Sequence, residues 1–170
     1  MYKISRAAIY FTLLAAFIIE GSVLNHIRIF GAAPDLVLII VIFFGSFLGG
    51  AAGLEAGIFA GILRDIFAFD FFGINMFVLG ITGLVVGGLN TKFSRDSQLT
   101  QVILVFLFTV FSLLMHFGIV SMFSSFTSLG LGEYFMISVL PVSIYTTLIS
   151  IPVFSQLIRI FNLKMPEEFI

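Results

Sequence analysis

A carboxylate inside an apolar helix is the first group in this chain that could do chemistry. Asp65 ends a register in which every fourth residue is glycine, formed by Gly45, Gly49, Gly53, Gly57 and Gly61. Residues four apart share one side of a helix, so Asp65 lies on the same face as Gly57 and Gly61. Small residues at this spacing let helix backbones approach closely in a membrane, where a carboxylate is costly. The pattern predicts a closely packed Gly57–Gly61–Asp65 face. This face either packs among the chain's own helices or forms a groove for another protein's helix.

Arg64 is the sequence neighbour of Asp65 but not automatically its partner, because adjacent helical positions do not face each other. We expect Arg64 to extend outward along the helix surface. Asp65 is then left to pair with Arg28, with backbone amides of the next helix, or with a partner chain. Because Asp65 is predicted near the outer membrane boundary, a hydrated and purely structural role stays open beside a functional one.

Two further carboxylates border the same helices. Glu55 lies about 200° around the helix from Gly57 and therefore faces away from the glycines. It is either a charge favoured by the helix N-terminus or a contact for cytoplasmic partners. Glu20 falls near the outer end of the first apolar segment, and we expect it at the membrane interface.

Catalytic and metal-binding patterns are weak in this sequence. Thr109, Ser112 and His116 form a polar stripe, but no acid follows nearby to complete a nucleophilic set, so interhelical hydrogen bonding is the better interpretation. His26 has no companion at metal-ligand spacing. The chain has 0 cysteines, which excludes disulfides and thiol chemistry. The sequence therefore predicts no enzyme activity, no cofactor and no metal site.

The composition places the chain in lipid. Hydrophobic residues make up 60% of its 170 positions and charged residues 10%, whereas soluble domains have about 25% charged residues. The net charge of −1 gives no indication of nucleic acid binding. The basic start with Lys3 and Arg6 resembles a signal peptide, but the small residues 31–33 lie far past the apolar run and precede Pro34. We therefore expect a retained first span.

The hydropathy pattern predicts an all-α integral membrane protein with six transmembrane helices in a single domain over residues 1–170. One helix over 36–69 would reach about 50 Å, well beyond the hydrocarbon thickness, so we expect a turn in the patch from Gly49 to Gly53. The short second to fourth segments indicate helices packed inside protein. The six predicted spans are 7–24, 36–50, 54–69, 76–89, 99–123 and 134–160.

The distribution of basic residues predicts the orientation. With six spans and a cytoplasmic N-terminus, only Arg28 and Arg64 lie outside, which is a clear positive-inside bias. With five spans the bias would vanish. Both termini are therefore expected in the cytoplasm. The basic residues placed inside are Lys3, Arg6, Lys92, Arg95, Arg159 and Lys164.

These residues also carry a resemblance to a known family. Pro34-Asp35-Leu36, the series from Glu55 through Gly57 and Gly61 to Asp65, and then Gly73 resemble MreD, a small subunit of the bacterial rod-shape system. The specific likeness covers roughly residues 34–90. One departure is the turn before Glu55, which is Gly-Gly-Ala-Ala-Gly-Leu, whereas the family usually has basic residues there.

The resemblance implies a non-catalytic protein of the bacterial inner membrane that binds MreC and supports lateral peptidoglycan synthesis. It would act with MreB, RodA and the transpeptidase partner of RodA, and a homodimer is possible. The implied fold resembles the substrate-binding subunits of energy-coupling-factor transporters, so a vitamin-binding transporter subunit is the alternative function. MreC would dock on the outer half of the glycine register, near Asp65 and Asp35. The residues implied in partner binding or helix packing are Pro34, Asp35, Glu55, Gly57, Gly61, Asp65 and Gly73.

Overall fold

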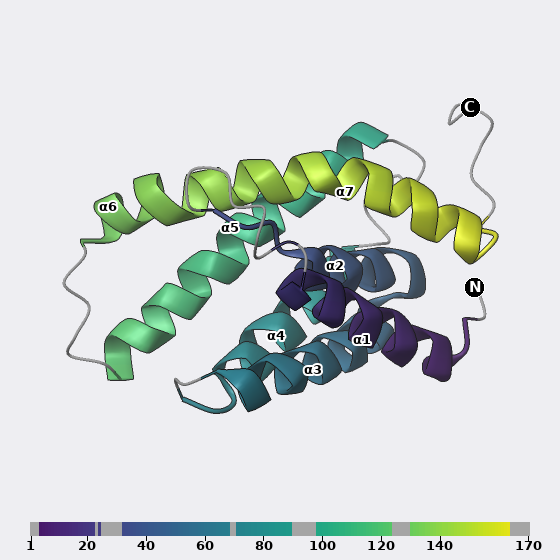
Figure 1. Ribbon diagram of the computed structural model, residues 1–170, viewed down its shortest axis with the longest axis horizontal. Helices are drawn as coiled ribbons and strands as arrows, with labels where there is room; N and C mark the ends of the chain where they lie inside the picture. Colours follow the sequence, from purple (N-terminus) through teal and green to yellow (C-terminus); the bar gives the residue numbers. More distant parts are fainter. Residues whose placement is uncertain are drawn as a thin grey trace.

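The residues that the computed structural model describes form six helical passes that alternate in direction, and the fifth pass runs obliquely across the view in Figure 1. The described residues are 4–22, 24, 32–68, 71–89, 98–123 and 130–163. The first five passes are α1 (Arg6–Ser22), α2 (Leu36–Leu48), α3 (Gly50–Phe67), α4 (Ile74–Leu89) and α5 (Gln98–Phe123). The last pass is continuous and joins α6 (Leu131–Tyr134), a π-helical segment (Phe135–Val139) and α7 (Leu140–Ile160).

The predicted break between the second and third segments is confirmed, and it falls at a single residue. Gly49 has a φ of 96°, a conformation that side chains with a Cβ rarely adopt. Its N–H closes the last turn of α2 on Gly45, and its carbonyl accepts from Gly53 in the first turn of α3. The third helix therefore begins at Gly50, four residues earlier than the predicted start at 54, and most of the glycine-rich patch is helical.

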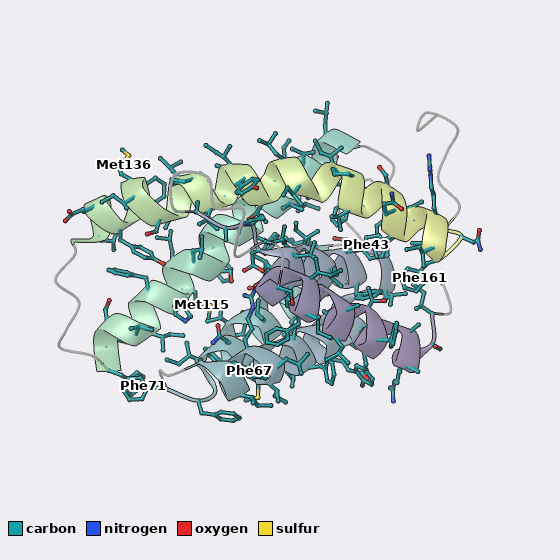
Figure 2. The ribbon with its side chains drawn as sticks, viewed as in Figure 1. Phe43, Phe67, Phe71, Met115, Met136 and Phe161 are labelled. Carbon is teal, nitrogen blue, oxygen red and sulfur yellow. The ribbon has the colours of Figure 1, made fainter. Side chains whose placement is uncertain are left out.

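Helix α2 forms the centre of the molecule. It is apolar on every side, as expected of a helix that contacts no solvent, and 11 of its 13 residues are buried. It packs against α1, α3, α4, α5 and α7. The ring of Phe43 in α2 also lies near the ring of Phe154 in the last pass. It lies near the ring of Phe161 as well, directly after that pass (Figure 2). A helix of this length spans only about 20 Å, so its position inside protein agrees with the expectation from its short apolar segment.

The two long passes lie at the margin of this bundle. Residues Leu99–Phe123 and Leu131–Ile160 are each long and apolar enough to cross a membrane, and fewer than a third of the residues in their most apolar windows are buried. The π-helical segment has a local cause. Pro141 has no N–H, so the regular ladder is interrupted, and the N–H of Leu140 donates to Phe135 five residues back.

Both ends of the helical set lie at one end of the molecule. In Figure 1, α1 begins and α7 finishes on the same side, as an even number of passes requires. The arrangement agrees with the predicted six passes but does not by itself orient them in a membrane. Several charges used for that orientation lie outside the described residues, together with His26: Lys3, Arg28, Lys92, Arg95 and Lys164.

Candidate functional site

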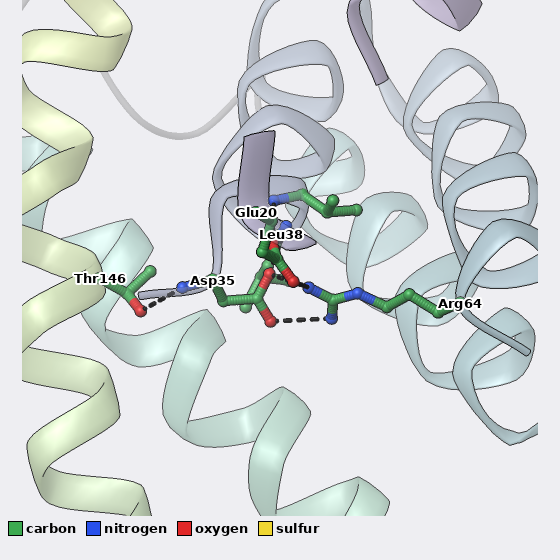
Figure 3. Close-up of polar contacts among 6 residues, drawn as sticks. Glu20, Asp35, Leu38, Arg64 and Thr146 are labelled. Carbon is green, nitrogen blue, oxygen red and sulfur yellow. Dashed lines mark hydrogen bonds and ion pairs between the residues drawn. The ribbon is translucent and has the colours of Figure 1, made fainter. Parts of the chain in front are cut away.

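Arg64 is the centre of a charged network at the ends of α1 and α2. Its Nη1 donates to Oδ2 of Asp35 at 2.9 Å, and its Nη2 lies 2.6 Å from Oδ1 of Asp35 and 2.6 Å from Oε1 of Glu20 (Figure 3). The side chain is 19% exposed, so the prediction that Arg64 extends outward is wrong. The reason is that two carboxylates from other helices lie on this side and fill the guanidinium fork with charge-assisted hydrogen bonds.

The same two carboxylates also cap α2. Asp35 is the N-cap residue, and its Oδ1 accepts from the N–H of Leu38 at 2.7 Å. Oε2 of Glu20 accepts from the N–H of Val37 at 3.0 Å. The first amides of a helix have no partner within the helix, and they favour negative charge. The N–H of Asp35 donates in turn to Thr146 Oγ1 of α7 at 3.0 Å. We call Glu20, Asp35, Arg64 and Thr146 the Arg64 network; it joins α1, α2, α3 and α7.

Asp65 serves a second helix end on another side of α3. Its Oδ1 accepts from the backbone N–H of Asn75 at 3.1 Å and from the Asn75 amide at 2.9 Å, while Oδ2 accepts from the N–H of Met76 at 3.0 Å. The expectation that Asp65 binds amides of the next helix is confirmed, and Asp65 is 3% exposed. Arg28, the other predicted partner, lies outside the described residues. Asp65 thus caps α4 and joins it to α3.

The glycine register packs inside the chain. A methyl group added at Gly57 would overlap the backbone of Leu79, and one added at Gly61 would overlap the backbone of Met76. The predicted close packing of this face is therefore confirmed, and its partner is α4. The alternative, in which MreC docks on the outer half of the register beside Asp65, is wrong because α4 already occupies that face.

Pro34 and Gly73 lie just before the two capped helices. Pro34 is buried directly before the N-cap Asp35. Gly73 has a φ of 102°, which favours glycine, and its carbonyl accepts from Phe77 in the first turn of α4. Gly73 therefore sets the turn that brings the amide of Asn75 to Asp65.

Glu55 contacts the first helix at the opposite end of α3. It accepts a hydrogen bond from the Tyr10 hydroxyl, and Arg6 Nε lies 3.4 Å from its Oε1. The interpretation of Glu55 as a charge at the helix N-terminus is wrong, because α3 begins at Gly50 and its first turn contains no acid. A contact with cytoplasmic partners stays a prediction.

The Arg64 network forms part of the wall of an open cavity of about 350 Å³. Phe17, Pro34 and Val142 also line it. The guanidinium and both carboxylates are bound to one another or to the first amides of α2, so the network holds helices in place and has no free nucleophile or base. Among the described residues no group of three or more His, Asp or Glu side chains could hold a metal ion.

Thr109, in the polar stripe of α5, does not donate the expected hydrogen bond to another helix. Its hydroxyl donates to the carbonyl of Val105 in its own helix at 2.7 Å. Thr82 and Thr147 do the same in α4 and α7. A hydroxyl in an apolar helix satisfies its own polarity in this way at little cost.

Sequence reasoning missed four pairings in this site: Arg64 with Glu20, Arg64 with Asp35, the Asn75 side chain with Asp65, and Thr146 with the Asp35 amide. Asn75 had a signal, because it lies two residues after Gly73 at the start of a helix, where free amides are expected. The α4 partner of the glycine register also had a signal. In α4, Gly83 and Gly87 repeat the four-residue spacing and would clash with Gly53 and Gly50 if they carried a Cβ. This second glycine pair marks α4 as the partner of the register.

Comparison with known families gives one match. Residues 1–162 match the family described as rod shape-determining protein MreD. No curated protein and no solved structure matches the chain.

Proposed function

The chain belongs to the MreD family of rod shape-determining proteins, and we propose that it is a non-catalytic scaffold that binds MreC in the inner membrane. The observation that carries this proposal is the match over residues 1–162, which covers all six helical passes. In this role the protein supports lateral peptidoglycan synthesis together with MreB, RodA and the transpeptidase partner of RodA. The family match also favours this function over a vitamin-binding transporter subunit.

The geometry supports a scaffold because the polar side chains hold the protein's own helices together. The hydrogen bonds of the Arg64 network and of the Asp65 cap are made within the chain, and α4 packs against every glycine of the register except Gly49. The described faces that remain open are outer helix faces. Those of the long passes carry large exposed apolar side chains such as Leu107 and Leu148. We infer that the membrane helix of MreC packs on such an outer face, where van der Waals contact drives association.

The proposed orientation places both termini in the cytoplasm. Its support is the positive-inside bias of the sequence and the position of both ends of the helical set on one side of the molecule (Figure 1). The Arg64 network then lies toward the outer side, and the pair of Tyr10 and Glu55 lies toward the cytoplasm.

Co-purification from native membranes tests the proposed function. The tagged chain is extracted in mild detergent from rod-shaped cells, and its partners are identified by mass spectrometry. We expect MreC to be retained and cells lacking the protein to lose their rod shape until the chain is supplied. A chain that retains a small vitamin and no MreC would contradict the scaffold and support the transporter subunit.

A further inference from the structure

A groove between α1 and α3, beside the point where Leu54 and Ile58 approach Gly80 of α4, has a polar end and an apolar length. We call it the inner groove; its volume is about 340 Å³. Tyr10 and Glu55 line it toward one end, beside Ala51 and Leu54, and Ile58, Phe59 and Ile62 continue along α3. The polar end lies near the start of both helices, at the end of the molecule where α7 finishes (Figure 1).

The polar end presents both signs of charge to the surroundings. Arg6 and Glu55 lie 3.4 Å apart, and their side chains are 79% and 34% exposed. An exposed pair of this kind is weakly held, so either group can take another partner. A phosphate beside Arg6 and an ammonium beside Glu55 would complement this end of the groove.

The length and the charges of the groove indicate the class of occupant. From Ala51 to Ile62 it follows twelve residues of α3, a rise of roughly 16 Å at 1.5 Å per residue. An extended alkyl chain can lie along the apolar residues at van der Waals distance. The charges of both signs at Arg6 and Glu55 complement a zwitterionic head group, which an apolar membrane helix lacks.

We propose that the inner groove binds one acyl chain of a phospholipid whose head group carries a primary ammonium. The chain lies along Leu54, Ile58 and Ile62, and the head group lies at Arg6 and Glu55. The direction of the groove fits this ligand, because its charged end lies at an end of the molecule and its apolar end lies toward the middle. A phosphatidylethanolamine of the cytoplasmic leaflet has this chemistry. The site is separate from the proposed MreC contact.

Native mass spectrometry of the full chain tests the proposal. The protein is reconstituted into vesicles of equal parts phosphatidylethanolamine and phosphatidylglycerol, and the lipids retained after mild extraction are counted. We expect one phosphatidylethanolamine per chain. Ile58→Trp fills the groove and removes this lipid. Leu148→Trp, at a 61% exposed position of α7, serves as the matched control and retains it.

The head-group contact has its own variant. Glu55→Gln keeps an acceptor for Tyr10 and removes the charge, so we expect it to fold and to lower the preference for phosphatidylethanolamine over phosphatidylglycerol roughly fivefold. Equal lipid retention by the wild type and Ile58→Trp would overturn the site. A wild-type preference for phosphatidylglycerol, or an unchanged preference in Glu55→Gln, would overturn the proposed head group. Co-purification of MreC would be unaffected in each case, so the two proposals fail separately.

Discussion

Arg64 and Asp65 are neighbours in the sequence and bind different helices. Successive helical residues point about 100° apart, so one side chain reaches the ends of α1 and α2 while the other reaches the start of α4. Asp65 accepts directly from the first amides of α4, which have no partner within their own helix. Arg64 acts indirectly, because it holds the carboxylates of Glu20 and Asp35 that accept from the first amides of α2. At the residue scale, the charges of this membrane protein are used to connect short helices.

The first prediction concerns the charge balance of the Arg64 network. Arg64→Leu leaves two carboxylates without their cation, and we expect it to lower the free energy of unfolding by about 3 kcal/mol. Adding Glu20→Gln removes one unpaired charge and keeps an acceptor for the Val37 amide. The double variant should therefore recover about 1 kcal/mol of this loss. Unfolding titrations in mixed micelles measure both; a double variant less stable than Arg64→Leu would refute the charge argument.

The second prediction concerns the cap of α4. Asp65→Leu removes the acceptor of three hydrogen bonds, and we expect a loss of about 3 kcal/mol. Asp65→Asn keeps one carbonyl acceptor and should lose less. Ile66→Ala, at the adjacent 60% exposed position, is the control and should change the unfolding midpoint little. Equal midpoints for Asp65→Leu and Ile66→Ala would show that the cap contributes nothing.

At the scale of elements, α3 and α4 form the most extensive helix pair. Glycines on both helices bring the backbones together, which in lipid replaces the hydrophobic drive that water supplies to soluble proteins. In the long passes, Gly118 of α5 has open space where a Cβ would project, so it makes no comparable backbone contact within the chain.

The third prediction compares these two kinds of glycine. Gly57→Ala adds a methyl group that overlaps the backbone of Leu79, and we expect this overpacking to lower the free energy of unfolding by about 1–3 kcal/mol. Gly118→Ala meets nothing within 4 Å and should be neutral or stabilising by up to about 1 kcal/mol through helix propensity. Thermal unfolding in one detergent measures both. Similar losses for the two variants would mean that the α3–α4 contact is looser than described.

Features with a local cause could be predicted from the sequence. The six helices follow from hydropathy, the break at Gly49 from the length of segment 36–69, and the packing of Gly57 and Gly61 from their spacing. The direction of Arg64 could not be predicted in the same way. Its partners lie 29 and 44 residues away in the sequence, and only the packing of α1 and α2 against α3 brings them within reach. For the same reason, the sequence could not decide whether one of the chain's own helices or a helix of another protein packs against the glycine register.

At the scale of the whole molecule, four short helices form a bundle held together by internal contacts, and two long helices lie at its margin. The short passes, of 13 to 18 residues, rise about 20–27 Å, somewhat less than the hydrocarbon thickness of about 30 Å. The long passes exceed this thickness and carry exposed apolar side chains along their length. This division of roles suits a protein that presents helix faces to partners.

The fourth prediction is the orientation in the membrane. Because the chain has 0 cysteines, single cysteines can be introduced without background. Cysteines at Lys92 and after Lys164 should react with permeant reagents only, and a cysteine at Gly130 should react with impermeant reagents in intact cells. Labelling of Lys92→Cys from outside would contradict the six-pass orientation with both termini in the cytoplasm.

Photocrosslinking in living cells tests the central claim, that the protein binds MreC through an outer helix face. A leucine-sized photoreactive residue is placed at Leu107 and Leu148, which are 55% and 61% exposed, and at Leu79, which lies against Gly57 and is 1% exposed. The account predicts a crosslink to MreC from at least one of the exposed positions and none from Leu79. A crosslink from Leu79 alone, or no crosslink to MreC from any of the three positions, would contradict it.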